Sequence, residues 1–246
     1  MFAEERRQHI LAALTRDGRV EVAALAERFA VSEDTVRRDL NTLAEQGFLQ
    51  KTHGGAVALA TARMDWQSRR SVLTEAKARI GTAAAELVEP HQTLFVDAGL
   101  TTLEFVRALQ VRPLRIVTNS LDVAQVLADD GEVQLVLSGG EWFGRERHLS
   151  GPAALATVRA HRADLAILGA CAVHPTLGVT ATHPGDAEVK RAMFDGAARR
   201  VLLADRGKFD QVAPNFVARL DAFDLLITDA PPPDLGPAAP SVKLAE

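Results

Sequence analysis

The sequence predicts an α/β protein of two domains, an N-terminal winged helix-turn-helix followed by a largely parallel, doubly wound α/β domain. Up to about residue 57, apolar residues recur at spacings of three and four, as they do on one face of a helix. After Ala76, short β-type apolar runs alternate with helical stretches, which favours a parallel sheet with helices on both faces. We therefore expect a first domain at residues 1–57, a connector at 58–75 and a second domain at 76–230.

The composition restricts the class of protein. With 246 residues, 47% of them hydrophobic, the chain has enough apolar side chains for a substantial core. It contains no apolar run of the roughly 18 to 20 residues that a membrane span needs, and its charged start lacks the apolar segment of a signal peptide. We therefore expect a cytoplasmic protein with no membrane partner. The single cysteine, Cys171, excludes an intrachain disulfide and a cysteine cluster for a metal, and we expect no metal and no cofactor.

Residues 231–246 are expected to form a loose tail. The run Pro231 to Pro233 cannot continue a helix or a central strand. Gly236, Pro237 and Pro240 follow closely, so the sequence offers no signal for a further regular element.

Helix signals in the first domain match a helix-turn-helix. Arg7–Leu14 and Val22–Phe29 each place apolar residues on one face, and a tight turn separates the second segment from a third helix at about residues 33–46. Ser32 is suited to cap that third helix at its N-terminus. Its apolar face, which we expect in the core, consists of Val36, Leu40 and Leu43.

The opposite face of the third helix carries side chains that suit a DNA major groove. Arginine can bind guanine through two hydrogen bonds, asparagine can do the same with adenine, and threonine can reach a phosphate or a thymine methyl group. The candidate DNA contacts at this helix are Ser32, Thr35, Arg37, Arg38, Asn41 and Thr42. Next, residues 51–57 can form two short strands around a glycine turn, a wing on which Lys51 and His53 are expected near the phosphate backbone.

These spacings alone leave an alternative open. An ordinary three-helix bundle whose polar face only meets water would show the same periodicity. The net charge of −4 argues against an overall basic, indiscriminate polyanion binder, yet it permits a local basic surface.

A specific string separates these alternatives. The chain reads Val31-Ser32, then Thr35 to Leu40, Leu43, Gly47 and finally His53-Gly54-Gly55-Ala56, which resembles the signature of the DeoR family of regulators across the whole module. In that family the third helix reads the operator, so the resemblance implies that Thr35, Arg37 and Arg38 contact DNA. Asp39 adjoins both arginines, and it can either orient one of them or pair with the scaffold.

In the second domain, three predicted strands end in small polar residues. The turn Asp97 to Thr102 joins a strand to a helix, where backbone N–H groups and the helix dipole can receive an anion. Any one such turn is more often architecture than a site, but three together predict a pocket at the carboxyl ends of the strands. The candidates are Asp97, Gly99, Thr101, Thr102, Thr118, Asn119, Ser120, Gly139 and Gly140, with Lys190 and Lys208 as sources of positive charge.

The DeoR-family resemblance extends over almost all of this domain. Its marks are Asp97 to Thr102, Thr118-Asn119, Gly139-Gly140, Glu188 to Arg191 and Asp205 to Phe209. The resemblance implies a sensor domain with the sugar-phosphate isomerase fold and a phosphorylated sugar or polyol as effector. The chain departs from the family pattern at Leu100, where a small hydroxyl residue is usual, and at Arg206-Gly207, where a serine pair is usual.

Individual roles in the pocket follow from charge. Since a carboxylate repels phosphate, Asp97 is assigned to a sugar hydroxyl or to bracing its turn. Lys208 directly follows a strand end and is the preferred cation. His174 and His183 flank a polar loop, and either one can contact a ligand or simply be exposed.

The hypothesis is a transcription regulator, a repressor of sugar or polyol metabolism genes. In it, the sugar phosphate changes the fraction of molecules that can bind operator DNA. A homo-oligomer is expected because paired modules double the DNA contacts. One alternative is an isomerase-like enzyme in which Asp97, Glu188 and Asp205 move protons. Another is an architectural DNA-binding protein with a vestigial pocket.

Overall fold

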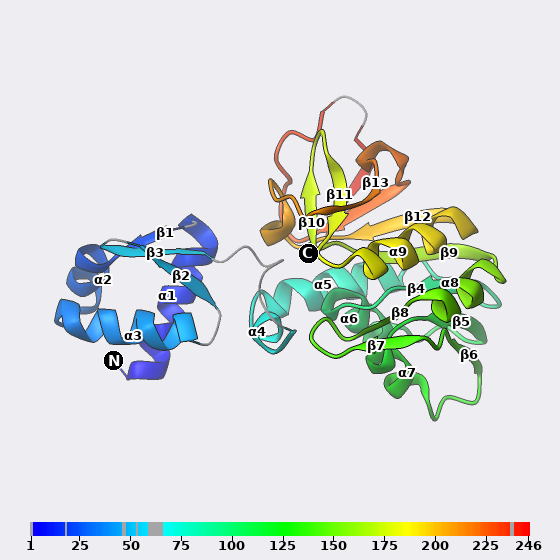
Figure 1. Cartoon of the computed structure of the whole chain (residues 1–246), viewed down its shortest axis with the longest axis horizontal. Helices are drawn as coiled ribbons and strands as arrows, with labels where there is room; N and C mark the ends of the chain where they lie inside the picture. The colour runs from blue at the N-terminus through cyan, green and yellow to red at the C-terminus, as the bar shows by residue number, and fades with distance from the viewer. Residues whose placement is uncertain (1, 18, 46–47, 53, 59–65, 237–238) are drawn as a thin grey trace. The chain divides into compact units, whose positions relative to one another are not determined.

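The computed structural model describes residues 2–17, 19–45, 48–52, 54–58, 66–236 and 239–246. The chain divides into two compact units, residues 1–69 and residues 70–246 (Figure 1). The first unit holds the helix-turn-helix elements, and the second holds the alternating strands and helices.

The first unit is a winged helix-turn-helix, as predicted. Its elements are α1 (Ala3–Asp17), β1 (Arg19–Glu21), α2 (Val22–Phe29), α3 (Glu33–Glu45), β2 (Leu49–Thr52) and β3 (Gly55–Ala58). The strands form an antiparallel sheet in the order β1-β3-β2. The bounds of α2 are those expected from its periodicity, whereas β1 was not expected, because three residues are too few to show an alternating pattern.

The turn between α2 and α3 is short because Ala30 adopts a left-handed conformation, with φ of 52°. The N–H of Val31 then bonds to the carbonyl of Ala26, which ends α2. Val36, Leu40 and Leu43 are buried in the core of this unit, as their helical spacing predicted.

The second unit is built on a seven-stranded sheet in which every pair of neighbouring strands is parallel. In order across the sheet, the strands are β15 (Ser241–Leu244), β14 (Leu225–Thr228), β12 (Ala197–Leu203), β9 (Ala163–Gly169), β4 (Thr93–Val96), β5 (Leu114–Thr118) and β6 (Val133–Leu137). The apolar residues of the five central strands, β14, β12, β9, β4 and β5, are almost fully buried, as expected of strands covered on both faces.

Helices cover both faces of this sheet, which confirms the doubly wound arrangement (Figure 1). On one face, α5 (Thr74–Ala85), α6 (Leu100–Ala108) and α7 (Leu121–Leu127) share a core with the sheet. On the other face, α8 (Pro152–Arg159) and α9 (Pro184–Gly196) do the same. Since α6 and α7 directly follow β4 and β5, their N-termini lie at the carboxyl edge of the sheet.

Smaller elements are attached to this frame. An antiparallel sheet contains β10 (Ala172–His174), β11 (Gly178–Ala181) and β13 (Asn215–Ala218), and a hairpin contains β7 (Glu141–Phe143) and β8 (His148–Ser150). The short helices are α4 (Trp66–Arg70), η2 (Arg206–Lys208) and η3 (Leu220–Ala222). No helix among the described residues is long and apolar enough to cross a membrane.

The prediction of a loose tail over residues 231–246 is wrong for its last part. Residues Ser241–Leu244 form β15 and pair in parallel with β14, and the N–H of Ala245 donates to the carbonyl of Thr228. Backbone pairing holds this strand, while Val242 and Leu244 remain exposed. An edge strand with mostly exposed side chains leaves no buried apolar pattern in the sequence, so the prolines before it dominated the prediction.

Candidate functional site

The exposed face of α3 carries the predicted DNA-reading side chains. Arg37, Arg38 and Asn41 are exposed. The guanidinium of Arg37 pairs with Glu33 at 2.5 Å and with Asp34 at 3.0 Å. The guanidinium of Arg38, by contrast, has no hydrogen bond or ion pair within the described part of the chain. Arg38 therefore offers a free planar donor group on the outer face of the helix.

Hydroxyl groups on α3 already make local bonds. Ser32 Oγ accepts the backbone N–H of Thr35 at 3.2 Å, so Ser32 caps α3 as its position predicted, and the two hydroxyls lie 2.9 Å apart. The hydroxyl of Thr42 donates to the carbonyl of Arg38 at 3.1 Å. On the wing, Lys51 is exposed on β2, whereas His53 lies outside the described residues.

Asp39 pairs with the scaffold, one of the two roles left open by the sequence. Its Oδ2 accepts from Arg6 Nε at 2.5 Å, and both side chains are buried. Arg6 lies on α1, so this ion pair fixes α3 against the first helix of the unit. A charge-assisted bond of this kind keeps the outer face of α3 in one orientation.

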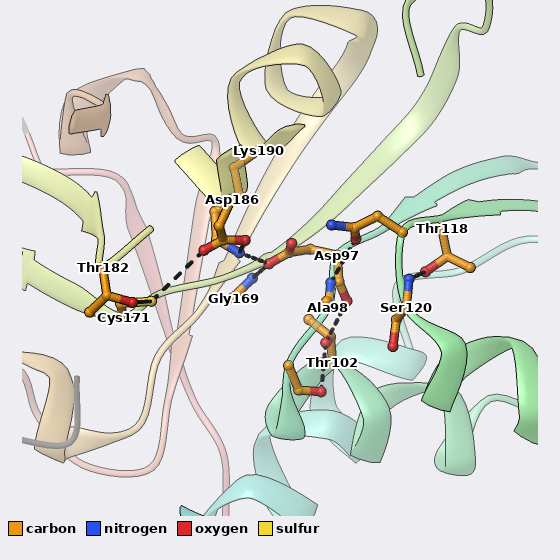
Figure 2. Close-up of polar contacts among 12 residues, drawn as sticks. Asp97, Ala98, Thr102, Thr118, Ser120, Gly169, Cys171, Thr182, Asp186 and Lys190 are labelled. Carbon is orange, nitrogen blue, oxygen red and sulfur yellow. Dashed lines mark hydrogen bonds and ion pairs between the residues drawn. The ribbon is translucent and has the colours of Figure 1, made fainter. Parts of the chain in front are cut away.

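In the second unit, a buried ion cluster lies at the carboxyl edge of the sheet (Figure 2). Asp97, directly after β4, accepts the N–H of Gly169 on its Oδ2 at 3.1 Å and pairs through the same atom with Lys190. The ammonium of Lys190 also lies 3.1 Å from Asp186. The three side chains are all buried. Asp97 follows β4, Gly169 ends β9, and Asp186 and Lys190 lie on α9, so the cluster joins the ends of two strands to one helix.

Burial and charge shift both members of the central pair. Burial raises the pKa of Asp97 to about 6, against the opposing effect of Lys190. Burial acts to lower the pKa of Lys190, but the carboxylates of Asp186 and Asp97 outweigh it, and the pKa lies above its ordinary value. Lys190 is therefore charged at neutral pH, and its charge is already balanced by two acidic neighbours.

The turn after β4 is braced by the polar residues predicted to surround it. Thr102 Oγ1 donates to the carbonyl of Asp97 at 2.7 Å, and Asn119 Oδ1 accepts the N–H of Ala98 at 3.0 Å. Thr118 Oγ1 accepts the N–H of Ser120 at 3.1 Å, and Ser120 caps α7. The structure thus brings these residues together (Figure 2), and their side chains make hydrogen bonds to backbone groups of the turns.

What remains open at this turn is the start of α6. The first N–H groups of a helix have no carbonyl partner within the helix. Thr101 lies in that first turn, and no hydrogen bond of its hydroxyl is found among the residues that the structure describes. Asp97 Oδ1 is likewise buried without a partner there. Both the first N–H groups of α6 and one carboxylate oxygen at this turn are therefore without a partner among the described residues.

The two glycines after β6 have a structural reason to be glycine. Gly139 and Gly140 have φ values of 65° and 99°, which disfavour other residues. A Cβ on Gly140 would lie 2.3 Å from the carbonyl oxygen of Ser150. This turn therefore permits the hairpin strand β8 to approach the sheet, and ligand contact by the two glycines stays a prediction.

Lys208 lies on η2, beyond the carboxyl end of β12. Its side chain is 6% exposed, and no partner for its ammonium is found among the described residues. Asp205 caps η2 by accepting the N–H of Gly207 at 3.0 Å, and its other oxygen has no partner in the part of the chain that the structure describes. Arg206 pairs outward with Asp229 at 2.9 Å. Lys208 is thus a nearly buried lysine at this edge of the sheet, with no ion pair found among the described residues.

Other predicted candidates lie apart from the ion cluster or serve local structure. Glu188 is exposed. His183 Nδ1 accepts the N–H of Gly185 and caps α9, and His174 Nδ1 accepts N–H groups of its own turn. Asp186 was missed, although its place four residues before Lys190 on one helix is a recognisable signal for an ion pair.

Two family models match the chain. The DeoR-like helix-turn-helix domain matches residues 6–62, and the DeoR C terminal sensor domain matches residues 73–230. The glycerol-3-phosphate regulon repressor of Escherichia coli (strain K12) is 34% identical over 235 residues, which cover 95% of this chain and 93% of that protein. The HTH-type transcriptional repressor GlcR of Bacillus subtilis (strain 168) is 33% identical over 235 residues, covering 94% and 90%.

Solved structures give a weaker likeness. Ribose 5-phosphate isomerase A from Methanocaldococcus jannaschii matches with a TM-score of 0.41 and 17% identity, covering 56% of this chain and 55% of its own. The delta subunit of eIF2B from Chaetomium thermophilum matches with a TM-score of 0.46 and 17% identity, covering 64% and 56%. At these scores the family rests on the two models and the curated relatives.

Proposed function

Because the chain belongs to the DeoR family of transcription regulators, we propose that it is a repressor of sugar or polyol genes whose operator binding is controlled by a phosphorylated sugar or polyol. The two repressors described above match over 93% and 90% of their own length. The chain is accordingly a regulator, and the isomerase alternative is not favoured.

We assign DNA reading to α3 and the wing. Arg38 is the central contact, since its guanidinium is exposed and free to bind two acceptors on guanine. Arg37 can exchange its exposed acidic partners for DNA. Ser32, Thr35, Asn41 and Thr42 follow on or beside the same face, with Lys51 and His53 assigned to the phosphate backbone.

We assign the phosphate of the effector to the start of α6 and to Lys208. The unpaired N–H groups of the first helical turn and the hydroxyl of Thr101 suit an anion. The observation that carries this assignment is the nearly buried ammonium of Lys208, which has no partner among the described residues. Asp97 Oδ1 suits a sugar hydroxyl, and Lys190 acts by holding Asp97 in place.

Control follows from linkage. An effector that binds one arrangement of the protein more tightly shifts the population toward it, and DNA occupancy changes by the same free energy. A homo-oligomer acting in the cytoplasm fits this scheme, because two recognition helices match a symmetric operator. We assign repression, not activation, because the more similar relatives are named repressors. A less similar relative from Haemophilus influenzae, 27% identical over 227 residues, is named an L-fucose operon activator.

The test combines ligand and DNA binding. Thermal unfolding of the full chain is measured with inorganic phosphate, glycerol 3-phosphate, glucose 6-phosphate and fructose 1-phosphate, and each compound that raises Tm is added to duplexes from the region upstream of the gene. We expect at least one organic phosphate to raise Tm and to release the DNA. The proposal fails if none does either, or if the protein turns the compound over.

A single substitution tests the phosphate assignment. Lys208→Ala is expected to weaken binding of the active compound by about 10- to 100-fold, the usual loss for one charge-assisted hydrogen bond. Lys243→Ala is the matched control, because Lys243 is a partly exposed lysine on β15 that pairs with Glu86. Equal affinity in Lys208→Ala and the parent would remove Lys208 from the site.

A further inference from the structure

The hairpin of β7 and β8 is fixed against the candidate effector site. The N–H of Leu149 donates to the carbonyl of Asn119 at 2.8 Å, and Asn119 Nδ2 donates back to the carbonyl of Leu149 at 3.3 Å. Arg147 binds both carboxylate oxygens of Asp122 on α7. Strand β8 is therefore held at the carboxyl end of β5, next to the braced turn.

The same strand touches the start of α9. A Cβ on Gly185 would lie 2.5 Å from the hydroxyl oxygen of Ser150, so β8 and the first turn of α9 are in close contact. Helix α9 carries Asp186 and Lys190, two members of the buried ion cluster. Strand β8 thus lies between the end of β5 and the helix that supplies the charges of the site.

His148, the first residue of β8, is buried in this position. Its ring stacks on Phe143 with centroids 5.2 Å apart and planes 11° apart, and it lies 5.4 Å from the ring of His183. The side chain is 1% exposed, yet Nε2 has no hydrogen-bond partner within the described ranges. Buried polar atoms are seldom left unpaired, so a histidine that serves packing alone does not account for this nitrogen.

The charge state of the ring indicates which chemical group it can bind. Burial lowers the pKa of His148, while the nearby charges of Asp186 and Lys190 act in opposite directions. The imidazole is therefore neutral at physiological pH and carries one donor and one acceptor nitrogen. A neutral ring suits a hydroxyl group, which can both donate and accept, better than it suits a phosphate.

We propose that His148 contacts a hydroxyl group on the carbon chain of the phosphorylated effector through Nε2, and that it is a specificity-determining residue of the site. This inference rests on the proposed function. The phosphate is held by groups that every organic phosphate can use, whereas His148 reads a hydroxyl whose presence and position differ between compounds. A polar site built for a hydroxyl discriminates strongly against a compound that lacks it.

Calorimetric titration of the full chain tests this role. The ligands are inorganic phosphate, glycerol 3-phosphate, glucose 6-phosphate and fructose 1-phosphate. His148→Phe keeps a flat ring against Phe143 and removes both nitrogens, while His148→Asn keeps a polar group. The control is His161→Phe, since His161 precedes the amino end of β9 and lies at the opposite edge of the sheet.

We expect His148→Phe to weaken the tightest-binding organic phosphate by about tenfold or more and to leave inorganic phosphate within about twofold. His148→Asn should recover part of the loss, and His161→Phe should match the parent. The inference is overturned if the ratio of organic to inorganic phosphate affinity in His148→Phe equals that of the parent, whether all affinities stay the same or all fall by the same factor. If no organic phosphate binds the parent more tightly than inorganic phosphate, the proposed function itself fails and the role of His148 fails with it.

Discussion

The ion pairs on α3 and those at the end of β4 use the same kinds of side chain in opposite surroundings. In the pair of Arg37 with Glu33, the side chains are 55% and 48% exposed. In the pair of Lys190 with Asp97, they are 4% and 0% exposed. An exposed pair contributes about 0 to 1 kcal/mol, whereas removing one partner of a buried pair costs about 3–5 kcal/mol.

This difference separates two ways of preparing a binding surface. On α3, water and salt screen the charges, so Arg37 can leave its acidic partners when a polyanion arrives. At the carboxyl edge of the sheet, Lys190 and Asp97 cannot separate without leaving an uncompensated buried charge. In the function that we propose, the ligand therefore binds atoms outside this pair, namely Asp97 Oδ1 and the ammonium of Lys208.

The largest expected effect comes from breaking the buried pair. Lys190→Met leaves the carboxylates of Asp97 and Asp186 buried together, and we expect the free energy of unfolding of the second unit to fall by about 3–5 kcal/mol. Denaturant unfolding followed by circular dichroism measures this loss. Adding Asp97→Asn should restore part of it, because one uncompensated charge is then removed.

The matched control for this experiment is Lys243→Met, which breaks the exposed pair with Glu86. It should cost no more than about 1 kcal/mol. Similar losses in the two variants would show that burial does not distinguish these ion pairs, and the comparison would not hold.

A smaller effect is expected on the exposed surface. Arg38→Ala should weaken operator binding by about 1–3 kcal/mol, because the guanidinium is free to bind a base directly. Thermal stability and effector binding should not change. Fluorescence anisotropy with a labelled duplex measures the affinity, and Arg107→Ala on α6 is a control for the loss of one exposed arginine. Unchanged operator affinity would argue against the placement of α3 on DNA.

The smallest effect is expected from Glu33→Gln. It removes one of the two acidic partners of Arg37, and unfolding free energy should change by no more than about 0.5 kcal/mol because the pair is exposed. DNA binding at low salt should strengthen by about a few-fold, because Arg37 then has one carboxylate fewer to leave when it binds a phosphate. The gain should vanish at high salt. Weaker DNA binding at low salt would mean that Glu33 positions Arg37 instead of competing for it.

The elements that sequence reasoning predicted are those held by local patterns. The periodicity of Val22–Phe29 marks α2 with its observed bounds, and the apolar runs mark β4, β5, β6, β9, β12 and β14. The candidate site was predictable in outline for a similar reason, since Thr118 ends one buried strand, Asn119 follows it, and Asp97 follows the neighbouring strand. Parallel strands bring such ends to one edge of a sheet.

The parts that were not predictable depend on residues distant in the chain. Asp97 and Lys190 are 93 positions apart, and Arg6 and Asp39 are 33 apart. Nothing in the local sequence says that these charges meet. The sequence offered Lys190 only as a source of positive charge for the pocket, and His148 lies in a short hairpin with no distinguishing pattern.

By itself, the sequence determined the order of helices and strands, the two-domain plan and the family, because hydrophobic spacing and turn residues act over a few positions. The tertiary structure alone decided that Lys190 is neutralised within the protein, that Asp39 braces α3, that the final residues add a strand to the sheet and that His148 keeps an unpaired buried nitrogen. Each of these depends on which surfaces pack together and exclude water. Burial then sets the strength of every charge and hydrogen bond there.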